Sequence, residues 1–599
     1  MNIRILLTGL IICYLSPSIA QQPDLTTYFE QSGGKRTPRY QESIEYCKLL
    51  DRSSPLVNYQ TFGVSPQGRD LPMLIVDRLG NTSAAAVRKS GNMVLMIQAC
   101  IHPGEPDGKD AGYLFIRDLI TKPGYASLLD HVTLLFIPVM NVDGHERFGP
   151  YNRINQNGPE EMGWRTTAQN LNLNRDFMKA DAPEMQAWLS LFNEWLPDFF
   201  IDCHVTDGAD YQYVITYALE TLGTMEAGLS EWTAGTCEPF LVMEMAKAGM
   251  PIFPYVQFRR WHDPRSGLIN RAAPPMLSQG YTAVQNRPGL LIESHMLKPY
   301  DVRVRANAEL FRLVMELLNR DHQQLKKLVE TADRYTASPG FRVGEFPVSW
   351  SESLRDSVMV DFAGFDYTID TSELSGGLWF KYDDTRPVTW KLPMYLHSSV
   401  DQKVKLPEGY IIPPEWSEVI RRLKLHGIQM HTIEKGVEVM ASVYRFRNVK
   451  WQPRSYEGRN KVNYSLSDSI HTMAFPAGSV IVDMNQRTAR VIAHLLEPAS
   501  PDSYAAWGFF NAIFEQKEYF ESYVMEAEAR KMLAKDPLLK AEFEKKLAAD
   551  PDFSRDSYSI LGWFYSKTPW MDTRFNVYPV GRILDRKTVD QLLDHTSKD

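Results

Sequence analysis

Several features that mark particular protein classes are scarce in this 599-residue sequence. It contains only five cysteines, too few and too scattered for a scaffold built from disulfides, so a large apolar core must hold the fold. It has no internal repeat and no low-complexity segment, and nothing in its composition indicates disorder. Its net charge of −8 argues against nucleic acid as the main partner, because an anionic polymer would be repelled.

Long hydrophobic runs are also rare, and the one near the start has a specific pattern. Arg4 precedes an apolar stretch from Ile5 to Tyr14, and the small residues Ser18 and Ala20 follow. This is the pattern of a secretory signal peptide, expected to cover residues 1–20. No cysteine directly follows the expected cleavage point, and no later apolar run approaches the length of a membrane span. The sequence therefore predicts an exported protein, periplasmic or extracellular, without a membrane anchor.

The length predicts more than one folding unit, because a single core rarely serves so long a chain. Apolar strand-like runs alternate with helical patterns up to residue 336, which is typical of an α/β domain with a mixed, largely parallel sheet flanked by helices. Residues 337–497 show short alternating segments and predict a smaller β-rich domain of unknown role. Residues 498–599 predict a mainly helical segment, with a continuous helical stretch up to about Ala549.

Individual elements follow from local patterns. Thr37-Pro38 precedes apolar residues at helical spacing, which predicts a helix up to about Leu50. Residues 59–77 contain a Pro-Gln-Gly turn between two extended segments and predict a β-hairpin. In the second half we expect one helix from Glu415 to Leu425, and a last strand near Val482.

The most informative stretch is VLMIQACIHPGE, residues 94–105. Its apolar run predicts a strand buried on both faces, and Pro103-Gly104 predicts a turn that brings His102 and Glu105 together. Imidazole and carboxylate are both zinc ligands, and three protein ligands leave a position for water, as in catalytic zinc sites. An isolated pair of this kind is more often an ordinary surface turn, so the rest of the chain must decide.

Two later apolar runs end in similar residues. Phe199 to Cys203 is followed by His204, and the run GLLIESHM brings out Glu293. Open α/β sheets place their sites at the carboxyl ends of their strands, so His204 is expected beside His102 and Glu105 as the third ligand of one zinc ion per chain. Cys100 and Cys203 lie next to the histidines, but cysteine is among the most buried residue types, and we interpret both as core residues.

Seven motifs then occur in one order between Tyr40 and Arg305, and together the chain resembles the zinc carboxypeptidases of the carboxypeptidase A type. One motif alone would be weak support, whereas an ordered set at expected strand ends and loops is specific. The motifs are G-x-S-x-x-G-R at Gly63–Arg69, H-P-G-E at His102–Glu105, N-x-D-G at Asn141–Gly144, Trp164-Arg165, Asn174-Arg175, His204 and Glu293.

The resemblance implies a role for each matched residue. His102, Glu105 and His204 would bind zinc. Glu293 would be the general base that takes a proton from water, and Arg165 would face the oxyanion. Asn174 and Arg175 would bind the free C-terminal carboxylate of a peptide substrate, with Arg175 making two parallel hydrogen bonds. The implied activity is hydrolysis of the C-terminal peptide bond.

The sequence also departs from the family. Val205-Thr206 follow His204 where digestive members have Ser-Tyr, and the stretch between residues 207 and 280 is long. No tyrosine in that stretch can be matched to the family's mobile, substrate-contacting tyrosine, and Tyr281, directly after it, is the candidate. His295 is expected to line the same cleft as Glu293, because residues two apart on a strand face the same side. Beyond about Ser338 we find no resemblance from which a function can be carried over, and the oligomeric state cannot be read.

Two other functions compete with a peptide-cleaving carboxypeptidase. A zinc amidase or carboxypeptidase acting on cell-wall peptides is compatible with export. A catalytically inactive peptide-binding module is a different class, and the complete ligand set together with Glu293 argues against it.

Overall fold

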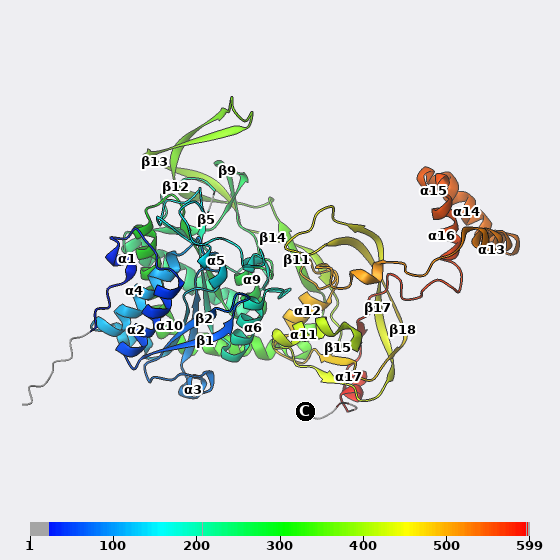
Figure 1. Cartoon of the computed structure of the whole chain (residues 1–599), viewed down its shortest axis with the longest axis horizontal. Coiled ribbons are helices and arrows are strands. Elements are labelled where there is room, and N and C mark those ends of the chain that lie inside the picture. Colours follow the sequence, from blue (N-terminus) through cyan, green and yellow to red (C-terminus); the bar gives the residue numbers. More distant parts are fainter. Residues whose placement is uncertain (1–22, 207, 595, 597–599) are drawn as a thin grey trace, which may run out of the picture.

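The computed structural model describes residues 23–206, 208–594 and 596. The expected signal peptide, residues 1–20, lies outside these residues. No helix among the described residues is both long enough and apolar enough to cross a membrane. Figure 1 shows an α/β body on the left, a β-rich body beside it and a helical arm that projects at the far right.

The α/β body is built on an eight-stranded sheet with the strand order β1-β2-β4-β3-β5-β10-β6-β7. The middle strands β4, β3, β5 and β10 are parallel, while the pairs β1–β2, β2–β4 and β10–β6 are antiparallel. The bounds are β1 Val57–Val64, β2 Asp70–Val76, β3 Met93–Gln98, β4 Val132–Ile137, β5 Phe199–Thr206, β6 Ile215–Leu219, β7 Ile252–Pro254 and β10 Gly289–His295. The predicted fold class is confirmed.

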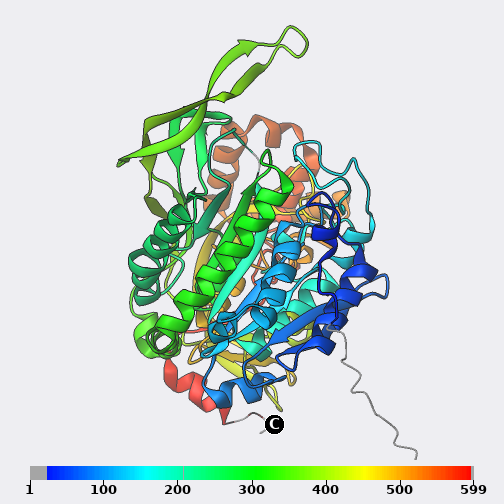
Figure 2. The same ribbon diagram turned by 90° about the vertical axis from the view of Figure 1, so that its left-hand side faces the viewer.

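Helices cover both faces of this sheet, which explains why its central strands are continuously apolar. On β3, Leu95 and Ile97 join the core under α2, α4 and α10, whereas Val94 and Met96 join the core under α3 and α6. Figure 2 shows the long helix α10 lying along the outer face beside α4. The bounds are α1 Tyr28–Gln31, α2 Tyr40–Ser53, α3 Ala84–Ser90, α4 Asp107–Thr121, α5 Val142–Glu146, α6 Pro183–Trp195, α7 Ala227–Trp232, α8 Glu238–Lys247, α9 Ser278–Val284 and α10 Tyr300–Thr336.

The elements predicted near the start of the α/β body are confirmed. The helix expected up to about Leu50 is α2, which continues three residues further, to Ser53. The expected hairpin is formed by β1 and β2, whose residues pair antiparallel.

A second sheet combines strands from both sides of residue 336. Its order is β12-β13-β9-β8, with β8 Gln257–Arg260, β9 Asp263–Ile269, β12 Val358–Thr371 and β13 Leu378–Tyr395. The β12–β13 hairpin projects from the top of the molecule in Figures 1 and 2. A two-stranded sheet of β11 Phe346–Glu352 and β14 Ser398–Val404 leads to the β-rich body. The domain limits stay predictions, and a sheet is shared across the expected limit.

The β-rich body has a six-stranded sheet with the order β16-β19-β15-β20-β17-β18. The strand near Val482 is β19, but it is not the last, because β20 follows about a hundred residues later and lies between β15 and β17. The expected helix at Glu415–Leu425 is α11 together with a preceding 3-10 turn, η5. The bounds are β15 Gly409–Ile412, η5 Pro414–Trp416, α11 Ser417–Leu425, β16 His431–Thr432, β17 Val437–Trp451, β18 Val462–Phe475, β19 Val480–Asp483, α12 Ala489–Leu496, β20 Gly581–Ile583 and α17 Arg586–Leu593.

The continuous helical stretch expected after residue 498 is wrong in its first part. Residues 498–521 contain one 3-10 turn, η6 Asn511–Phe514, and otherwise turns, because Pro498 and Pro501 lack amide donors and Tyr504 and Trp507 pack into the core. The helices of the projecting arm follow, and their buried residues form a separate small core. Their bounds are α13 Ser522–Lys535, α14 Pro537–Ala549, α15 Pro551–Arg555 and α16 Ser557–Tyr565.

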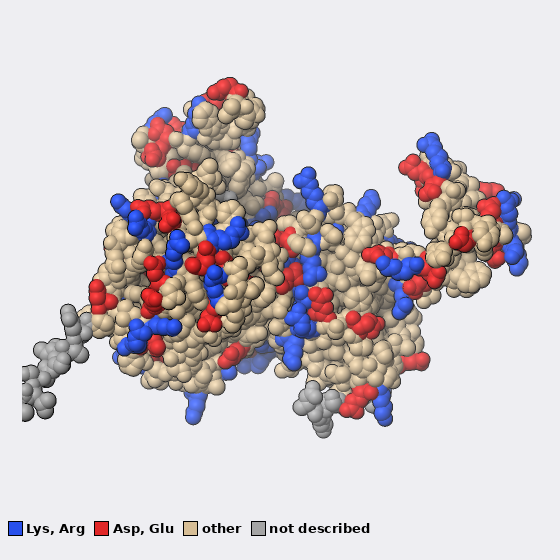
Figure 3. Space-filling view, in the orientation of Figure 1, with Lys and Arg blue, Asp and Glu red and all other residues tan. Residues whose placement is uncertain are grey.

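The β-rich body packs directly against the α/β body. Tyr281 of α9 donates a hydrogen bond to His426 Nδ1 at 2.9 Å, and His426 Nε2 lies 3.0 Å from the carbonyl oxygen of Met178. Arg422 Nε donates to the carbonyl oxygen of Lys179 at 2.8 Å. Apolar residues of both bodies share one buried cluster, so they form a continuous core. On the face in Figure 3, cationic and anionic side chains are interspersed over both bodies.

Candidate metal and substrate site

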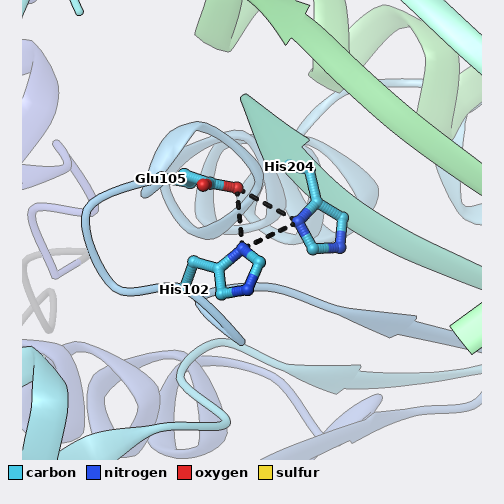
Figure 4. Close-up of side chains that lie close together, drawn as sticks. All are labelled: His102, Glu105 and His204. Carbon is cyan, nitrogen blue, oxygen red and sulfur yellow. Dashed lines mark hydrogen bonds and ion pairs between the residues drawn. The ribbon is translucent and has the colours of Figure 1, made fainter. Parts of the chain in front are cut away.

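The three predicted ligands converge at the carboxyl ends of β3 and β5. His102 Nδ1 lies 3.3 Å from Glu105 Oε2, and His204 Nδ1 lies 3.1 Å from the same oxygen and 3.2 Å from His102 Nδ1. Figure 4 shows both rings turned toward the carboxylate. All three residues are buried, and among the described residues they form a group whose donor atoms could hold a metal ion.

The local fold explains this convergence. β3 and β5 are parallel neighbours with Gln98 opposite Asp202, so the residues after Gln98 come level with His204. The turn closes through a hydrogen bond from the Glu105 amide to the carbonyl oxygen of His102 at 2.9 Å. The turn passes close to Arg153, since a Cβ atom at Gly104 would lie 2.5 Å from Arg153 Cδ and would displace that side chain.

Both imidazoles are held by their other nitrogen. His102 Nε2 donates to Asn172 Oδ1 at 2.9 Å, and His204 Nε2 donates to Asp202 Oδ2 at 2.8 Å. Asp202 in turn accepts a hydrogen bond from Gln98 Nε2 at 2.8 Å. With each Nε2 held in this way, both Nδ1 atoms face Glu105, the arrangement typical of metal-binding histidines.

The donor set fits zinc. Two imidazole nitrogens and a carboxylate oxygen form a usual set for a catalytic zinc ion. Bonds of about 2.0–2.1 Å in a tetrahedron require ligand atoms about 3.3–3.4 Å apart, and the three separations observed here are 3.3, 3.1 and 3.2 Å. The residues therefore need little rearrangement to hold the ion.

Charge in the cluster is balanced by its neighbours. Burial lowers the pKa of His102 to about 4, so its ring is neutral. Burial also opposes a charge on His204, but the carboxylate of Asp202 outweighs it and raises the pKa of His204 well above its usual value. For Glu105, burial favours the neutral form, but Arg153 and the histidines hold its pKa well below the usual range. The site is thus anionic at Glu105.

Two arginines reach the outer oxygen of Glu105. Arg153 Nη1 donates to Glu105 Oε1 at 2.6 Å, and the predicted Arg165 donates to the same atom at 3.2 Å through Nη1. The sequence analysis did not find Arg153. It lies in a loop rich in Asn, Gly and Pro whose length and path no local pattern fixes.

Glu293 lies on β10 directly opposite His204 of β5 in the parallel register. It lines the same cavity as the ligands, a hollow of about 600 Å³. Arg165, Asn174 and Arg175 also line this cavity, so it brings together all the matched motif residues expected to act on a substrate.

The expected carboxylate-binding pair lies in a 3-10 turn, η2 Leu173–Arg175. Asn174 is buried, and its Oδ1 accepts from the Ser278 amide at 3.4 Å. Arg175 Nη1 donates to the carbonyl oxygen of Asn174 at 2.7 Å, and its Nε donates to the hydroxyl of Tyr456 at 3.2 Å. A residue of the β-rich body therefore contacts the substrate side of the cavity.

Two predicted substrate contacts are wrong. Tyr281 is 0% exposed, and its hydroxyl is bound by Gln285 and His426, so it is a core residue between the two bodies. His295 is also 0% exposed, is not among the residues that line the cavity, and lies against the ring of Tyr211, with centroids 4.1 Å apart. Its Nε2 is 3.1 Å from Asp210 Oδ1. Strand alternation predicted its side of the sheet but not the loop that covers it.

The wall of the cavity includes residues that the sequence analysis missed. They come mainly from the long stretch after residue 207, where no motif could be matched, and no local signal would have found them. They are Tyr255, Gln257, Arg271, Leu277 and Gln279, with Asn152, Ile154 and Asn155 from the loop of Arg153.

Comparison with known proteins agrees with this geometry. The model of the family described as zinc carboxypeptidase matches residues 44–209. Carboxypeptidase 2 of Trichophyton rubrum is 21% identical over 495 residues, covering 80% of this chain and 85% of the relative. Carboxypeptidase 2 of Trichophyton equinum is 22% identical over 493 residues, with the same coverage of 80% and 85%. Matches of this length cannot fit within residues 21–336, so the similarity extends into the second half of the chain.

Solved structures give weaker matches. A metallo-carboxypeptidase from Burkholderia cenocepacia has 16% identity and a TM-score of 0.35, covering 47% of this chain and 69% of that one. Carboxypeptidase A from Helicoverpa armigera has 16% identity and a TM-score of 0.36, covering 50% and 75%. The predicted resemblance to zinc carboxypeptidases is confirmed by the family match and by the relatives.

Proposed function

We propose that this protein, whose residues 44–209 match the zinc carboxypeptidase model, is a zinc metallocarboxypeptidase. It releases the last residue of peptides that end in a free carboxylate. The observation that carries the proposal is the single cavity that holds the three ligands, Glu293 and Arg175 together. An inactive binding module would have no need of a carboxylate beside a complete ligand set.

His102, Glu105 and His204 would hold one zinc ion per chain. When bound, zinc supplies a Lewis acid that lowers the pKa of a water molecule toward about 7. Glu293 would accept a proton from that water and pass it to the amine that leaves. The position of Glu293 opposite His204 supports this role.

Arg165 would stabilise the negative charge that develops on the carbonyl oxygen of the bond being cut. Its guanidinium already faces the ligand cluster, since it reaches Glu105 Oε1 at 3.2 Å. A cation fixed before the reaction costs little reorganisation when the charge forms. Arg153 shares Glu105 Oε1 and would keep the carboxylate ionised.

Asn174 and Arg175 would bind the C-terminal carboxylate of the substrate. Of the five N–H donors of Arg175, the bonds to Asn174 and Tyr456 use one on Nη1 and the one on Nε. The fork of Nη1 and Nη2 suits a carboxylate through two parallel hydrogen bonds. An amide in the middle of a chain does not offer this pair of acceptors, which is why we propose an exopeptidase. We also propose that the enzyme is exported, because residues 1–20 have the pattern of a signal peptide.

Mass spectrometry of a peptide library after incubation with the full chain tests the proposal. We expect products shortened by one residue at the carboxyl end, no internal cuts, and loss of all cleavage on chelation with recovery on adding zinc. Internal cuts, or cleavage unaffected by complete removal of metal, would refute it. Purified cell-wall peptides in the same assay identify the alternative substrate class.

A further inference from the structure

The turn that joins β17 to β18 reaches from the β-rich body to the substrate cavity. We call residues 456–459 the hairpin tip. Tyr456 and Arg459 close it through two backbone hydrogen bonds, with N–O distances of 2.9 and 3.0 Å. The tip lies against the segment 172–175, which carries the expected carboxylate-binding pair.

Tyr456 contacts Arg175 directly. Its hydroxyl oxygen accepts from Arg175 Nε at 3.2 Å, while the carbonyl oxygen of Asn174 accepts from Nη1 at 2.7 Å. Because two bonds on different nitrogens fix both the position and the plane of a guanidinium, the Nη1–Nη2 fork is held in one orientation. An arginine side chain loses rotamer freedom when it binds a ligand, so fixing it beforehand favours binding of a carboxylate.

Glu457 contacts the same segment at its other end. Its Oε2 accepts from the Asn172 amide at 3.1 Å. Asn172 Oδ1 in turn accepts from the Asn174 amide at 3.1 Å and from His102 Nε2 at 2.9 Å. Asn172 therefore links Glu457 by hydrogen bonds both to Asn174 of the proposed carboxylate-binding pair and to the expected metal ligand His102.

The backbone of the tip singles out Glu457. Its φ is +49°, and that of Gly458 is +75°, the left-handed values that a two-residue hairpin turn of type I′ requires at both positions. Asn, Asp or Gly is the favoured first residue of such a turn. A glutamate in this conformation is held against its backbone preference, which points to a use for its side chain.

The tip is anchored firmly enough to position its neighbours. Arg459 Nε donates to Asp181 Oδ2 at 3.0 Å. Burial alone would raise the pKa of Asp181, but the hydrogen bonds from Arg459 and the charges of neighbouring cations outweigh burial and lower that pKa. The ring of Tyr456 lies over that of Trp507, with centroids 5.9 Å apart and planes 16° from parallel. Trp507 is 0% exposed, so this platform is part of the core.

We propose that the hairpin tip is a positioning element of the active site, in which Tyr456 orients Arg175 toward the substrate carboxylate and Glu457 holds the 172–175 segment in place. The inference rests on the proposed role of Arg175 as the carboxylate-binding residue. It assigns a role to the β-rich body, whose tip completes the substrate side of a cavity that the α/β body begins.

Tyr456→Phe in the full chain is the first test, because it deletes one hydroxyl and keeps the ring on Trp507. We expect KM for a free-acid peptide to rise about three- to tenfold, the range of one ordinary hydrogen bond, with kcat within about twofold and zinc content unchanged. The matched control is Tyr519→Phe, which alters a tyrosine outside the cavity lining that is 67% exposed, and it should leave both constants unchanged.

Glu457→Gly separates positioning from stability. Glycine suits the left-handed backbone, so the melting temperature should not fall, yet KM for the free-acid peptide should rise about three- to tenfold because the acceptor for Asn172 is lost. Glu457→Gln keeps an acceptor oxygen and should restore most of the affinity. A rise in KM that comes only with a lower melting temperature would overturn the positioning role of Glu457.

A double variant tests the route through Arg175. Because Tyr456 acts on that guanidinium, Tyr456→Phe should have no further effect on KM in an Arg175→Ala background. If the two residues acted independently, the fold-changes in KM of the two substitutions would multiply. Unchanged KM in both Tyr456→Phe and Glu457→Gly, in an enzyme that prefers free-acid over amidated peptides, would overturn the positioning role alone. A wild-type enzyme without that preference would refute the role of Arg175 in the proposed function, and the inference with it.

Discussion

The two sides of the substrate cavity are built in different ways. The metal side uses residues at the ends of β3, β5 and β10, neighbouring strands of one sheet whose register fixes their relative positions. The side proposed to bind the substrate carboxylate, called here the carboxylate side, is the 172–175 loop segment, which is contacted by the hairpin tip some 280 residues later in the chain. One side is thus set by a single sheet, and the other depends on packing between two bodies.

This difference predicts different kinetic effects on the two sides. The metal side should govern the chemical step, and the carboxylate side should govern substrate binding and selection.

The largest effect is expected at Glu293. Glu293→Gln keeps the size and hydrogen bonding of the side chain but cannot accept a proton, so kcat should fall at least about a hundredfold, and as much as about ten thousandfold. Zinc should stay at one per chain, as measured by elemental mass spectrometry. A variant that loses its zinc would instead make Glu293 a ligand, and the division of roles on the metal side would be wrong.

A smaller effect is expected at Arg175. Arg175→Ala should reduce kcat/KM for a free-acid peptide by about a hundredfold, since losing one partner of a desolvated charged pair costs about 3–5 kcal/mol and part of it is recovered by water. The amidated form of the same peptide should be a poor substrate of the wild type and be little affected by the change. Equal cleavage of the two forms by the wild type would contradict this account of the carboxylate side.

Stability should respond to pH at the contact between the two bodies. Burial lowers the pKa of His426 to about 4, against about 6.5 when unfolded, so the unfolded chain binds more protons between these values. The contribution of His426 to the free energy of unfolding is therefore complete above pH 6.5 and is lost as the pH falls toward 4. About 2 kcal/mol of it is lost at pH 5.

Urea unfolding of the wild type and of His426→Gln at pH 7 and pH 5 measures the pH-dependent contribution of His426 to stability. The pKa values of other buried histidines, such as His145 and His494, are also lowered by burial, so the difference between the two proteins is the relevant quantity. The variant should lose less stability than the wild type over this interval. Equal losses would mean that His426 is not a buried neutral residue of this contact.

The smallest effect is expected from the projecting arm. Its buried residues, among them Met525 and Phe564, form a core of their own; no residue between 519 and 570 lines the cavity, and the arm projects away from the α/β body in Figure 1. Replacing residues 519–570 by a short Gly-Ser linker should leave kcat and KM within about twofold. A clear loss of activity on long peptides would show that the arm takes part in substrate binding.

The same contrast explains what the sequence could predict. The convergence of His102, Glu105 and His204 was predictable, because each histidine follows an apolar run that forms a buried strand, and parallel strands end at a common edge of the sheet. Tyr281 and His295 were misassigned, since burial by a distant helix or a loop leaves no local pattern. The roles given to Glu293, Arg165 and Arg175 stay predictions.

The tip of the β17–β18 hairpin was beyond the reach of sequence patterns for a related reason. Glu457-Gly458 indicates a tight turn, but nothing near it names Asn172 as the partner of Glu457. Contacts between bodies are fixed by the whole of both surfaces. The loop of Arg153 was missed in the same way, because its path depends on what it packs against.

The position of β20 has a consequence for the order in which the enzyme is assembled. This strand is made after β15 and β17, yet it lies between them in the sheet, and its Arg582 Nε donates a hydrogen bond to Glu497 Oε1 at 3.0 Å in the interior. A nascent or clipped chain that ends before Gly581 has its zinc ligands but an unfinished sheet behind the β17–β18 hairpin. If the hairpin tip acts as proposed, such a chain could bind zinc but would discriminate poorly between substrates, and selectivity would arise only once β20 is in place.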